Sequence, residues 1–287
     1  MRERSDGCLV LDPQYAIEFT PEVTIGISNH PEDDLLSCYL SGYEVVTIEA
    51  PRITPKERQT IKRTVNRLFG TEITEEGPEK IVIQCPLKAS AFPPDKILRR
   101  EYALSSSLFQ EALEAFVKAD ATLASSVEER DEEVDRHYFL LVRLLRTLIL
   151  NPRMSEKLNV SLIDCLDYRL ISSLIENIAD QAVELARLAG HFRTSRKSDR
   201  WAKSFTEVGE MIKLTYEAVV KSILSREERI LLTANSKIEE SRALLQKLEG
   251  SVMSSQSNPT YFTATSVLRR VFDYLNDMID LVTPKRE

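Results

Sequence analysis

The chain has 287 residues, which is enough for two folded domains or for one large domain. With 43% hydrophobic and 29% charged residues it has the composition of an ordinary folded protein, and no run approaches the roughly 18 apolar residues of a membrane span. The net charge of −7 argues against non-specific binding to nucleic acid or to anionic lipid. The first residues lack the apolar core of a signal peptide, so we expect a cytoplasmic protein.

The cysteines and histidines are too scattered to form a zinc site. No C-x-x-C spacing occurs, and no histidine stands near a cysteine. Any transition-metal site must therefore be dominated by carboxylates. The sequence also has no G-x-S-x-G and no Gly-rich phosphate loop, so it gives no support for nucleophilic catalysis.

The first ninety residues predict two parts. Residues 1–21 include a short strand within 5–14 that has no evident partner, and residues 22–90 alternate strands with helices, which predicts a small α/β domain. The expected strands are 23–28, 43–49, 71–76 and 80–85, and the expected helices are 31–43 and 54–68. A capping box at Thr54 and Glu57 opens the second helix. The Lys and Arg side chains of this helix are interpreted as a solvated face in preference to an anionic contact surface.

Beyond a Pro-rich joint at 91–95, the chain is predicted to be helical to its C-terminus. The expected helices cover residues 96–118, 121–150, 161–189, 204–224, 226–248 and 263–281. Their grouping in threes predicts two three-helix repeats, at 96–192 and 203–287, on either side of a basic joint. The expected fold is therefore mainly α, with tandem three-helix bundles preceded by a small α/β domain.

Two pairs of carboxylates are the chemical peculiarity of the chain. Asp131 and Asp135 lie one turn apart on the second long helix, and Glu176 and Asp180 lie one turn apart on the third. Like charges at this spacing destabilise a helix by about 0.2–0.5 kcal/mol, and no Lys or Arg stands three or four residues from any of the four. The compensating charge must come from another helix, from solvent or from a bound metal ion.

Periodicity places the two pairs differently. The predicted apolar stripes are Leu123, Val127, Val134, Tyr138, Leu141 and Leu145 on one helix, and Ile171, Leu174, Ile178, Ala182 and Leu185 on the other. Asp131 and Asp135 fall at a margin of their stripe, whereas Glu176 and Asp180 fall near the face opposite theirs. Periodicity alone therefore favours a solvent-facing acidic ridge over a metal site.

The motif Ile175-Glu176-Asn177-Ile178-Ala179-Asp180-Gln181-Ala182-Val183, preceded by Asp131-x-x-x-Asp135 in a doubled three-helix array, resembles the PhoU family of phosphate-uptake regulators. The resemblance extends from about residue 96 to the C-terminus. It implies that Asp131, Asp135, Glu176 and Asp180 bind metal ions, which would be iron, zinc, or magnesium or manganese. The layout is most similar to the archaeal branch, in which an AbrB-like DNA-binding domain and an α/β segment precede the bundle.

Two departures from that family pattern limit what the resemblance implies. Residues 1–21 resemble only the tail of an AbrB-like domain, so we do not expect direct DNA binding by this chain. The second-repeat positions that correspond to the acidic pairs are Asn235, Glu239, Arg269 and Asp273. Because Arg269 can pair with Asp273 and Arg242 with Glu239, we expect one metal centre per chain, in the first repeat.

Three functions compete. The first is a metal-binding regulatory protein of phosphate homeostasis, not an enzyme, which acts as a homodimer on a phosphate-transporter ATPase or a sensor kinase and takes phosphate as a ligand through its metal. The second is a DNA-binding transcriptional regulator of phosphate-responsive genes, which needs a basic reading element. The third is a di-metal carboxylate enzyme, but ferritin-like sites need Glu-x-x-His, and Val134 and Leu188 stand three residues before His137 and His191. The sequence favours the first.

Overall fold

The computed structural model describes residues 2–3, 9–10, 20–87, 91–189, 196–254 and 259–282. The chain divides into two compact units, one of Met1–Asn66 with Gly70–Leu87 and one of Arg67–Phe69 with Lys88–Glu287. At the N-terminus β1 (Arg2–Glu3) pairs antiparallel with β2 (Leu9–Val10). The prediction of a strand without a partner is therefore wrong, because a two-residue strand is too short to show an alternating pattern. Residues 1, 4–8 and 11–19 of the predicted AbrB-like remnant lie outside the described residues.

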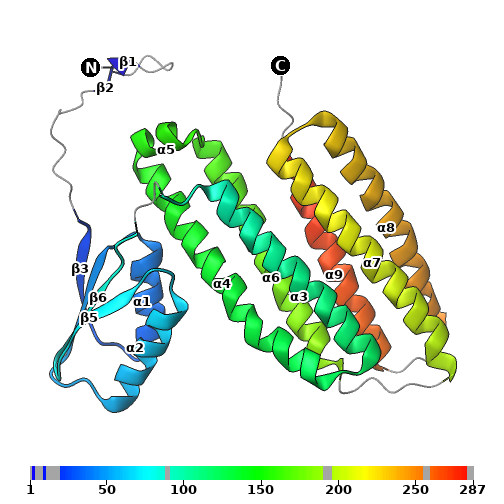
Figure 1. The fold of residues 1–287 in the computed structure, drawn as a ribbon, viewed down its shortest axis with the longest axis horizontal. Coiled ribbons are helices and arrows are strands. Elements are labelled where there is room, and N and C mark those ends of the chain that lie inside the picture. The colour runs from blue at the N-terminus through cyan, green and yellow to red at the C-terminus, as the bar shows by residue number, and fades with distance from the viewer. Residues whose placement is uncertain are drawn as a thin grey trace. The chain divides into compact units, whose positions relative to one another are not determined.

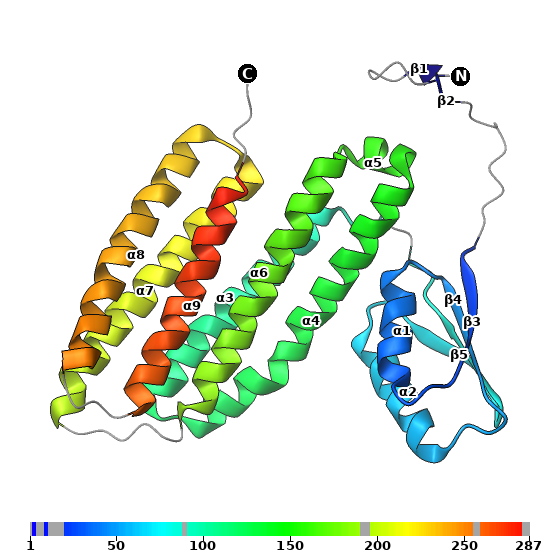
Figure 2. The same ribbon diagram turned by 180° about the vertical axis from the view of Figure 1, so that it is seen from behind.

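The α/β unit is built on a four-stranded sheet (Figure 1). Its elements are β3 (Glu22–Gly26), α1 (Pro31–Leu40), β4 (Val45–Glu49), α2 (Pro55–Arg67), β5 (Glu72–Glu76) and β6 (Lys80–Gln84). The strand order is β3-β4-β6-β5, with β3 and β4 parallel and the other pairs antiparallel. The helices lie on one face of the sheet (Figure 2), where paired residues such as Ile48 and Ile81 are fully buried.

The predicted capping box at the start of α2 is confirmed. The Glu57 carboxylate accepts hydrogen bonds from the Thr54 backbone N–H and hydroxyl, both at 2.7 Å, and the Glu57 N–H donates to Thr54 Oγ1 at 3.3 Å. Part of the basic face of α2 is compensated within the unit, because Arg58 and Lys62 contact the Glu76 carboxylate at 2.8 and 3.0 Å. These two cations therefore bind the β5–β6 hairpin. Because their charges are already paired within the unit, this contact disfavours the alternative of an anionic contact surface at these two positions.

The helical unit consists of two three-helix groups. The first contains α3 (Pro94–Lys118), α4 (Ala121–Leu150) and α6 (Leu162–Arg187), and the second contains α7 (Arg196–Ser225), α8 (Glu228–Ser254) and α9 (Pro259–Asp280). Helices within each group pack on one another, and the groups meet where α6 packs on α9 and α3 on α7. The predicted fold class is confirmed (Figure 1). No helix in the described ranges is long and apolar enough to cross a membrane.

Local capping explains why some predicted boundaries are accurate. The Asp120 carboxylate accepts from the N–H groups of Thr122 and Leu123 at 3.0 Å and starts α4. Ser161 and Asp164 form a reciprocal capping box that starts α6. One helix was not predicted, namely the short α5 (Pro152–Leu158) between them, whose seven residues are too few to show a helical period.

Other helix boundaries differ from the predicted ones because tertiary contacts extend the helices. α7 starts eight residues before its predicted start, α9 starts four residues before its predicted start, and α8 continues six residues beyond its predicted end at 248. The buried Trp201 near the start of α7 stacks on Tyr261 near the start of α9, with ring centroids 4.3 Å apart. This contact stabilises both helix starts, and nothing in the local sequence signals it.

Candidate metal centre

The four predicted carboxylates lie on two helices that pack on each other. α4 carries Asp131 and Asp135, and α6 carries Glu176 and Asp180. The charges of Asp135 and Asp180 both act on Asp131, and the charges of all three aspartates act on Glu176. The structure therefore brings the two pairs together at the α4–α6 contact, which neither motif indicates by itself.

The prediction that both α6 carboxylates face solvent is wrong for Glu176. Glu176 is half-buried, as are Asp131 and Asp135, whereas Asp180 is exposed. The physical reason is that α6 packs on α3, α4 and α9, so several of its faces are covered. Ile175, beside Glu176, is fully buried, although it lies outside the predicted apolar stripe.

Burial and mutual repulsion raise the pKa of every member of the set. Burial, then Asp135 and Asp180, raise the pKa of Asp131 to about 6. Burial, followed by the three aspartates, raises the pKa of Glu176 to about 7. Burial also raises the pKa values of Asp135 and Asp180. Four carboxylates that repel one another in a partly buried place form a strongly negative site, which favours either a proton or a cation.

The donor chemistry of this site fits a metal ion, but the side chains are not gathered around one point. Carboxylate oxygens are the preferred ligands of Mg²⁺, Mn²⁺ and other hard cations, and they also bind iron and zinc. Within the described residues, no three His, Cys, Asp or Glu side chains lie close enough together to hold one ion. The assignment of Asp131, Asp135, Glu176 and Asp180 as metal ligands therefore stays a prediction.

One carboxyl group near this site was not predicted. Glu101 on α3 is fully buried and accepts hydrogen bonds from the Ser172 hydroxyl on α6 at 2.8 and 2.9 Å. Burial raises the pKa of Glu101 well above its ordinary value, and the charge of Glu176 raises it further. The signal was present in the sequence, since Glu101 shares the apolar face of its helix with Leu98 and Leu104.

The second three-helix group does not repeat the acidic site. Arg269 lies 3.9 Å from Asp273, and Arg242 lies 3.6 Å from Glu239, which confirms the predicted local compensation. Arg269 also binds Glu249 on α8 at 2.6 Å, a contact that spacing could not predict. These carboxylates therefore have cations within one turn on their own helices. The pairs at the α4–α6 contact have none there, and the cation that contacts Asp135 is Arg67, at 2.9 Å.

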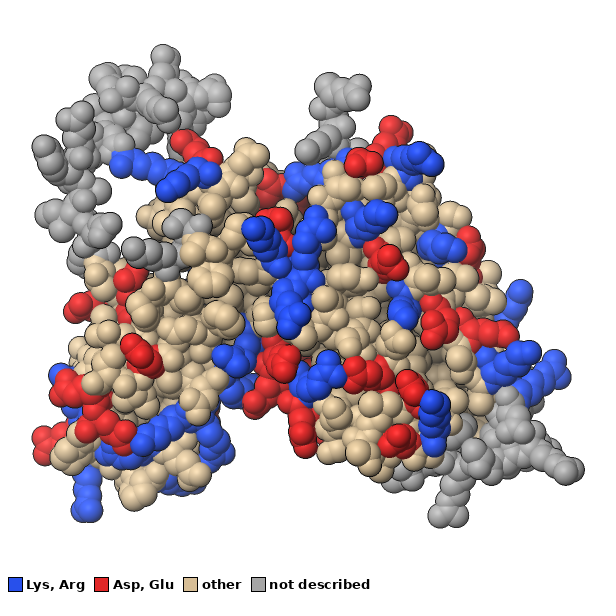
Figure 3. Space-filling model, in the orientation of Figure 1, with Lys and Arg blue, Asp and Glu red and all other residues tan. Residues whose placement is uncertain are grey.

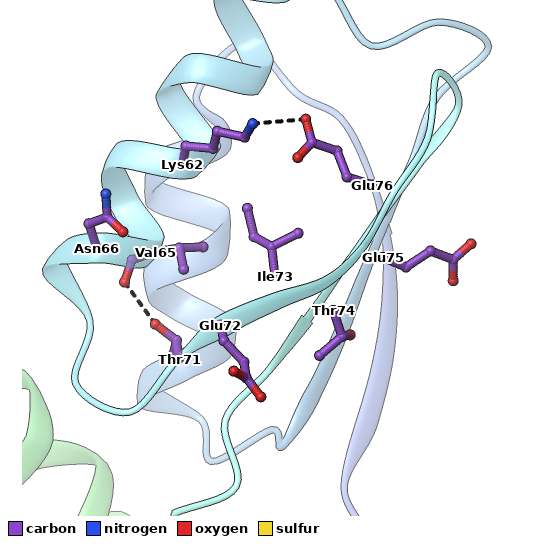
Figure 4. Close-up of a pocket in the computed structure, with 9 residues that line it drawn as sticks. All are labelled: Lys62, Val65, Asn66, Thr71, Glu72, Ile73, Thr74, Glu75 and Glu76. Atoms are coloured by element: carbon purple, nitrogen blue, oxygen red, sulfur yellow. Dashed lines mark hydrogen bonds and ion pairs between the residues drawn. The ribbon is translucent and has the colours of Figure 1, made fainter.

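The α/β unit has an open groove between α2 and the edge strand β5, with a volume of about 500 Å³ (Figure 4). Ile73 points toward α2, and the groove is crossed by the ion pair of Lys62 with Glu76. Its lining has no cysteine, histidine or serine, and its ionisable side chains are Lys62, Glu72, Glu75 and Glu76. On the face of the helical unit in Figure 3, basic and acidic side chains are interspersed.

Comparison with known proteins identifies the first three-helix group. Residues 98–189 match the PhoU domain family. The match begins four residues into α3 and ends two residues beyond α6, and so includes both carboxylate pairs. None of the curated proteins matches the chain significantly.

Two solved PhoU structures share the fold of the helical unit. PhoU from Pseudomonas aeruginosa has a TM-score of 0.54 at 16% identity, and the alignment covers 68% of this chain and 95% of that one. The phosphate transport system regulatory protein PhoU from Streptococcus pneumoniae has a TM-score of 0.56 at 13% identity, with 66% of this chain and 91% of that one covered. The PhoU-like architecture thus extends beyond the PhoU domain match at 98–189.

Proposed function

We propose that this chain is a metal-binding regulator of phosphate uptake, which acts through protein contacts and not through catalysis. The observation that carries the proposal is the meeting of two carboxylate pairs on α4 and α6, neither with a cation within one turn on its own helix, inside the segment that matches the PhoU domain. The likeness to a protein described as a phosphate transport system regulator supports the phosphate part. The α/β unit ahead of the bundle fits the archaeal type of layout.

All four carboxylates would contribute ligands to the ion. Asp131 and Asp135 would supply oxygen ligands from α4, and Glu176 and Asp180 would supply them from α6. Their mutual repulsion, which together with burial raises the pKa values of Asp131 and Glu176, would be relieved by the cation, and α4 would be joined to α6. When bound, iron, zinc, magnesium or manganese would supply positive charge to which phosphate oxygens or an acidic partner side chain could bind.

The proposed partners are a phosphate-transporter ATPase or a sensor kinase. A regulator of this kind needs a surface that changes with metal or phosphate, and the α4–α6 contact would provide it, because the ion fixes the two helices relative to each other. Binding would then shift the population of helix arrangements and so the affinity for the partner.

Elemental analysis of the purified protein tests the metal site. The comparison is with the variant in which Asp131, Asp135, Glu176 and Asp180 are all changed to Ala, and the matched control is Glu239→Ala with Asp273→Ala in the second group. We expect stoichiometric metal in the native chain and the control and none in the fourfold variant. Metal-free native protein after reloading, or equal metal in all three proteins, would refute the site.

Calorimetric titration tests the ligand. Inorganic phosphate added to metal-loaded native protein is expected to release or absorb heat with a saturating isotherm, and the fourfold variant is expected to give none. If the loaded native protein does not bind phosphate, the metal site could stand, but the role of phosphate as its ligand would be lost.

A further inference from the structure

The groove between α2 and β5 runs along an edge of the four-stranded sheet. The strand order is β3-β4-β6-β5, so β5 has a neighbouring strand on one side only. Within the described residues, the backbone of Glu72–Glu76 finds its hydrogen-bond partners in β6. A strand of this length presents roughly 17 Å of edge. Its outward N–H and C=O groups can pair with an additional extended chain.

The side of this edge that faces α2 has an apolar floor. Ile73 points toward α2, where Val65 lines the same groove (Figure 4). Ile73 is half-buried and pairs across the sheet with the buried Ile83. The groove volume of about 500 Å³ is within the range of roughly 300–1,000 Å³ that is usual for ligand sites. A strand added to β5 would therefore place an apolar side chain beside Ile73.

The other side of the same edge is acidic. Side chains alternate along a strand, so Glu72 faces the side opposite to Ile73, and Figure 4 shows Glu75 pointing away from α2. The Glu75 carboxylate lies 3.0 Å from Lys80 Nζ, whereas the exposed Glu72 forms no ion pair with any described residue.

The sheet itself supplies no cation to Glu72. The residues that follow it in register across the other three strands are Gln84, Val45 and Glu22, none of which is basic. Opposite charges on directly paired residues of neighbouring strands stabilise a sheet. A Lys or Arg on a strand added outside β5 would therefore find a free carboxylate at Glu72.

The same features restrict which chains can pair with this edge. A second β5 would place its own glutamates against Glu72 and Glu75, so pairing of two copies through this edge is repulsive. The register of β5 on β6 also shifts between Ile73 and Glu75, and such a bulge disfavours pairing with a long, flat strand. What remains is a short segment with basic side chains.

We propose that β5 binds a short, extended, basic segment of another protein by strand addition. Backbone groups of the segment would pair with the outer edge of β5, and an apolar side chain such as Val would enter the groove beside Ile73. The Lys or Arg residues on either side of that apolar residue would face Glu72 and Glu75, because they lie on the opposite side of the added strand. The proposal depends neither on the metal site nor on a role in phosphate uptake.

Fluorescence anisotropy of the full chain with a labelled peptide tests the proposal. The probe is Thr-Lys-Val-Lys-Val-Lys-Thr, and the control peptide has Glu in place of each Lys. The variant is Glu72→Lys, and its matched control is Glu22→Lys, the same change at an exposed position of the other edge strand, β3.

We expect the basic peptide to bind the native chain and Glu22→Lys equally, and to bind Glu72→Lys roughly tenfold more weakly. The acidic peptide should not bind. Absence of binding up to about 1 mM protein, or equal weakening by Glu22→Lys and Glu72→Lys, would overturn the proposal, since the second result would indicate general attraction to an acidic protein.

Hydrogen exchange followed by mass spectrometry distinguishes strand addition from binding by charge alone. The bound peptide should slow exchange of the backbone amides of β5 and leave those of β3 unchanged, because new backbone hydrogen bonds form only at the β5 edge. Binding without added protection in β5, or with protection in β3 instead, would show that β5 does not receive the strand.

Discussion

Removing the charge of Glu176 should stabilise the metal-free protein at alkaline pH. The change is Glu176→Gln, which keeps the size of the side chain. Burial is the largest cause of its raised pKa, followed by repulsion from Asp180, Asp135 and Asp131, while Arg169 acts in the opposite sense. The ionised form of Glu176 is therefore a cost to the folded state that the unfolded chain does not bear.

The sign and size of the effect follow from the two pKa values. The folded pKa of about 7 lies above the ordinary value of 4.5, so the folded state binds more protons between these values, and stability falls as pH rises through that window. The difference corresponds to roughly 3 kcal/mol, and solvent screening at a half-buried site lowers it to about 1–2 kcal/mol. Glu176→Gln should recover this amount at pH 8 and only a few tenths of a kcal/mol at pH 5.

Thermal unfolding with EDTA at pH 5 and pH 8 measures the effect. For a bundle of this size, about 1–2 kcal/mol raises Tm by roughly 2–8 °C. The control is Glu129→Gln, the same change at an exposed position of α4, which should shift Tm little at either pH. A gain at pH 8 no larger than at pH 5, or an equal gain from Glu129→Gln, would refute the electrostatic reasoning.

Two further changes probe the packing of the bundle. Gly209→Ala on α7 should destabilise the protein by about 1–3 kcal/mol, because the new Cβ would lie 2.7 Å from the buried Leu113 side chain of α3. Gly250→Ala on α8, where a Cβ meets nothing within 4 Å, should instead gain up to about 1 kcal/mol, and urea unfolding that ranked the two the other way would contradict the close contact. Glu101→Gln should leave stability near native at pH 7, because burial favours the uncharged carboxyl and Gln can still accept from Ser172. The same variant should gain stability relative to native at pH 9, and a large loss at pH 7 in chemical denaturation would show that Glu101 is ionised in the fold.

Local sequence determined the order and most of the boundaries of the elements. α4 was predicted at 121–150 and found there, because the Asp120 cap and the Asn151-Pro152 stop both act within a few residues. The capping box of α2, its basic face and the β5–β6 hairpin were visible for the same reason. The carboxylate spacing on α4 and α6 was also local, so the two pairs could be recognised before their positions in space were known.

Tertiary structure alone decided what surrounds those pairs. Periodicity assumes that a helix buries one face, but α6 packs on α3, α4 and α9, so Glu176 became half-buried instead of exposed. Glu101 and Ser172 lie 71 residues apart in the chain, and only the packing of α3 on α6 joins them. Which faces of α6 are covered depends on where the other helices lie. The sequence of α6 by itself does not contain that information.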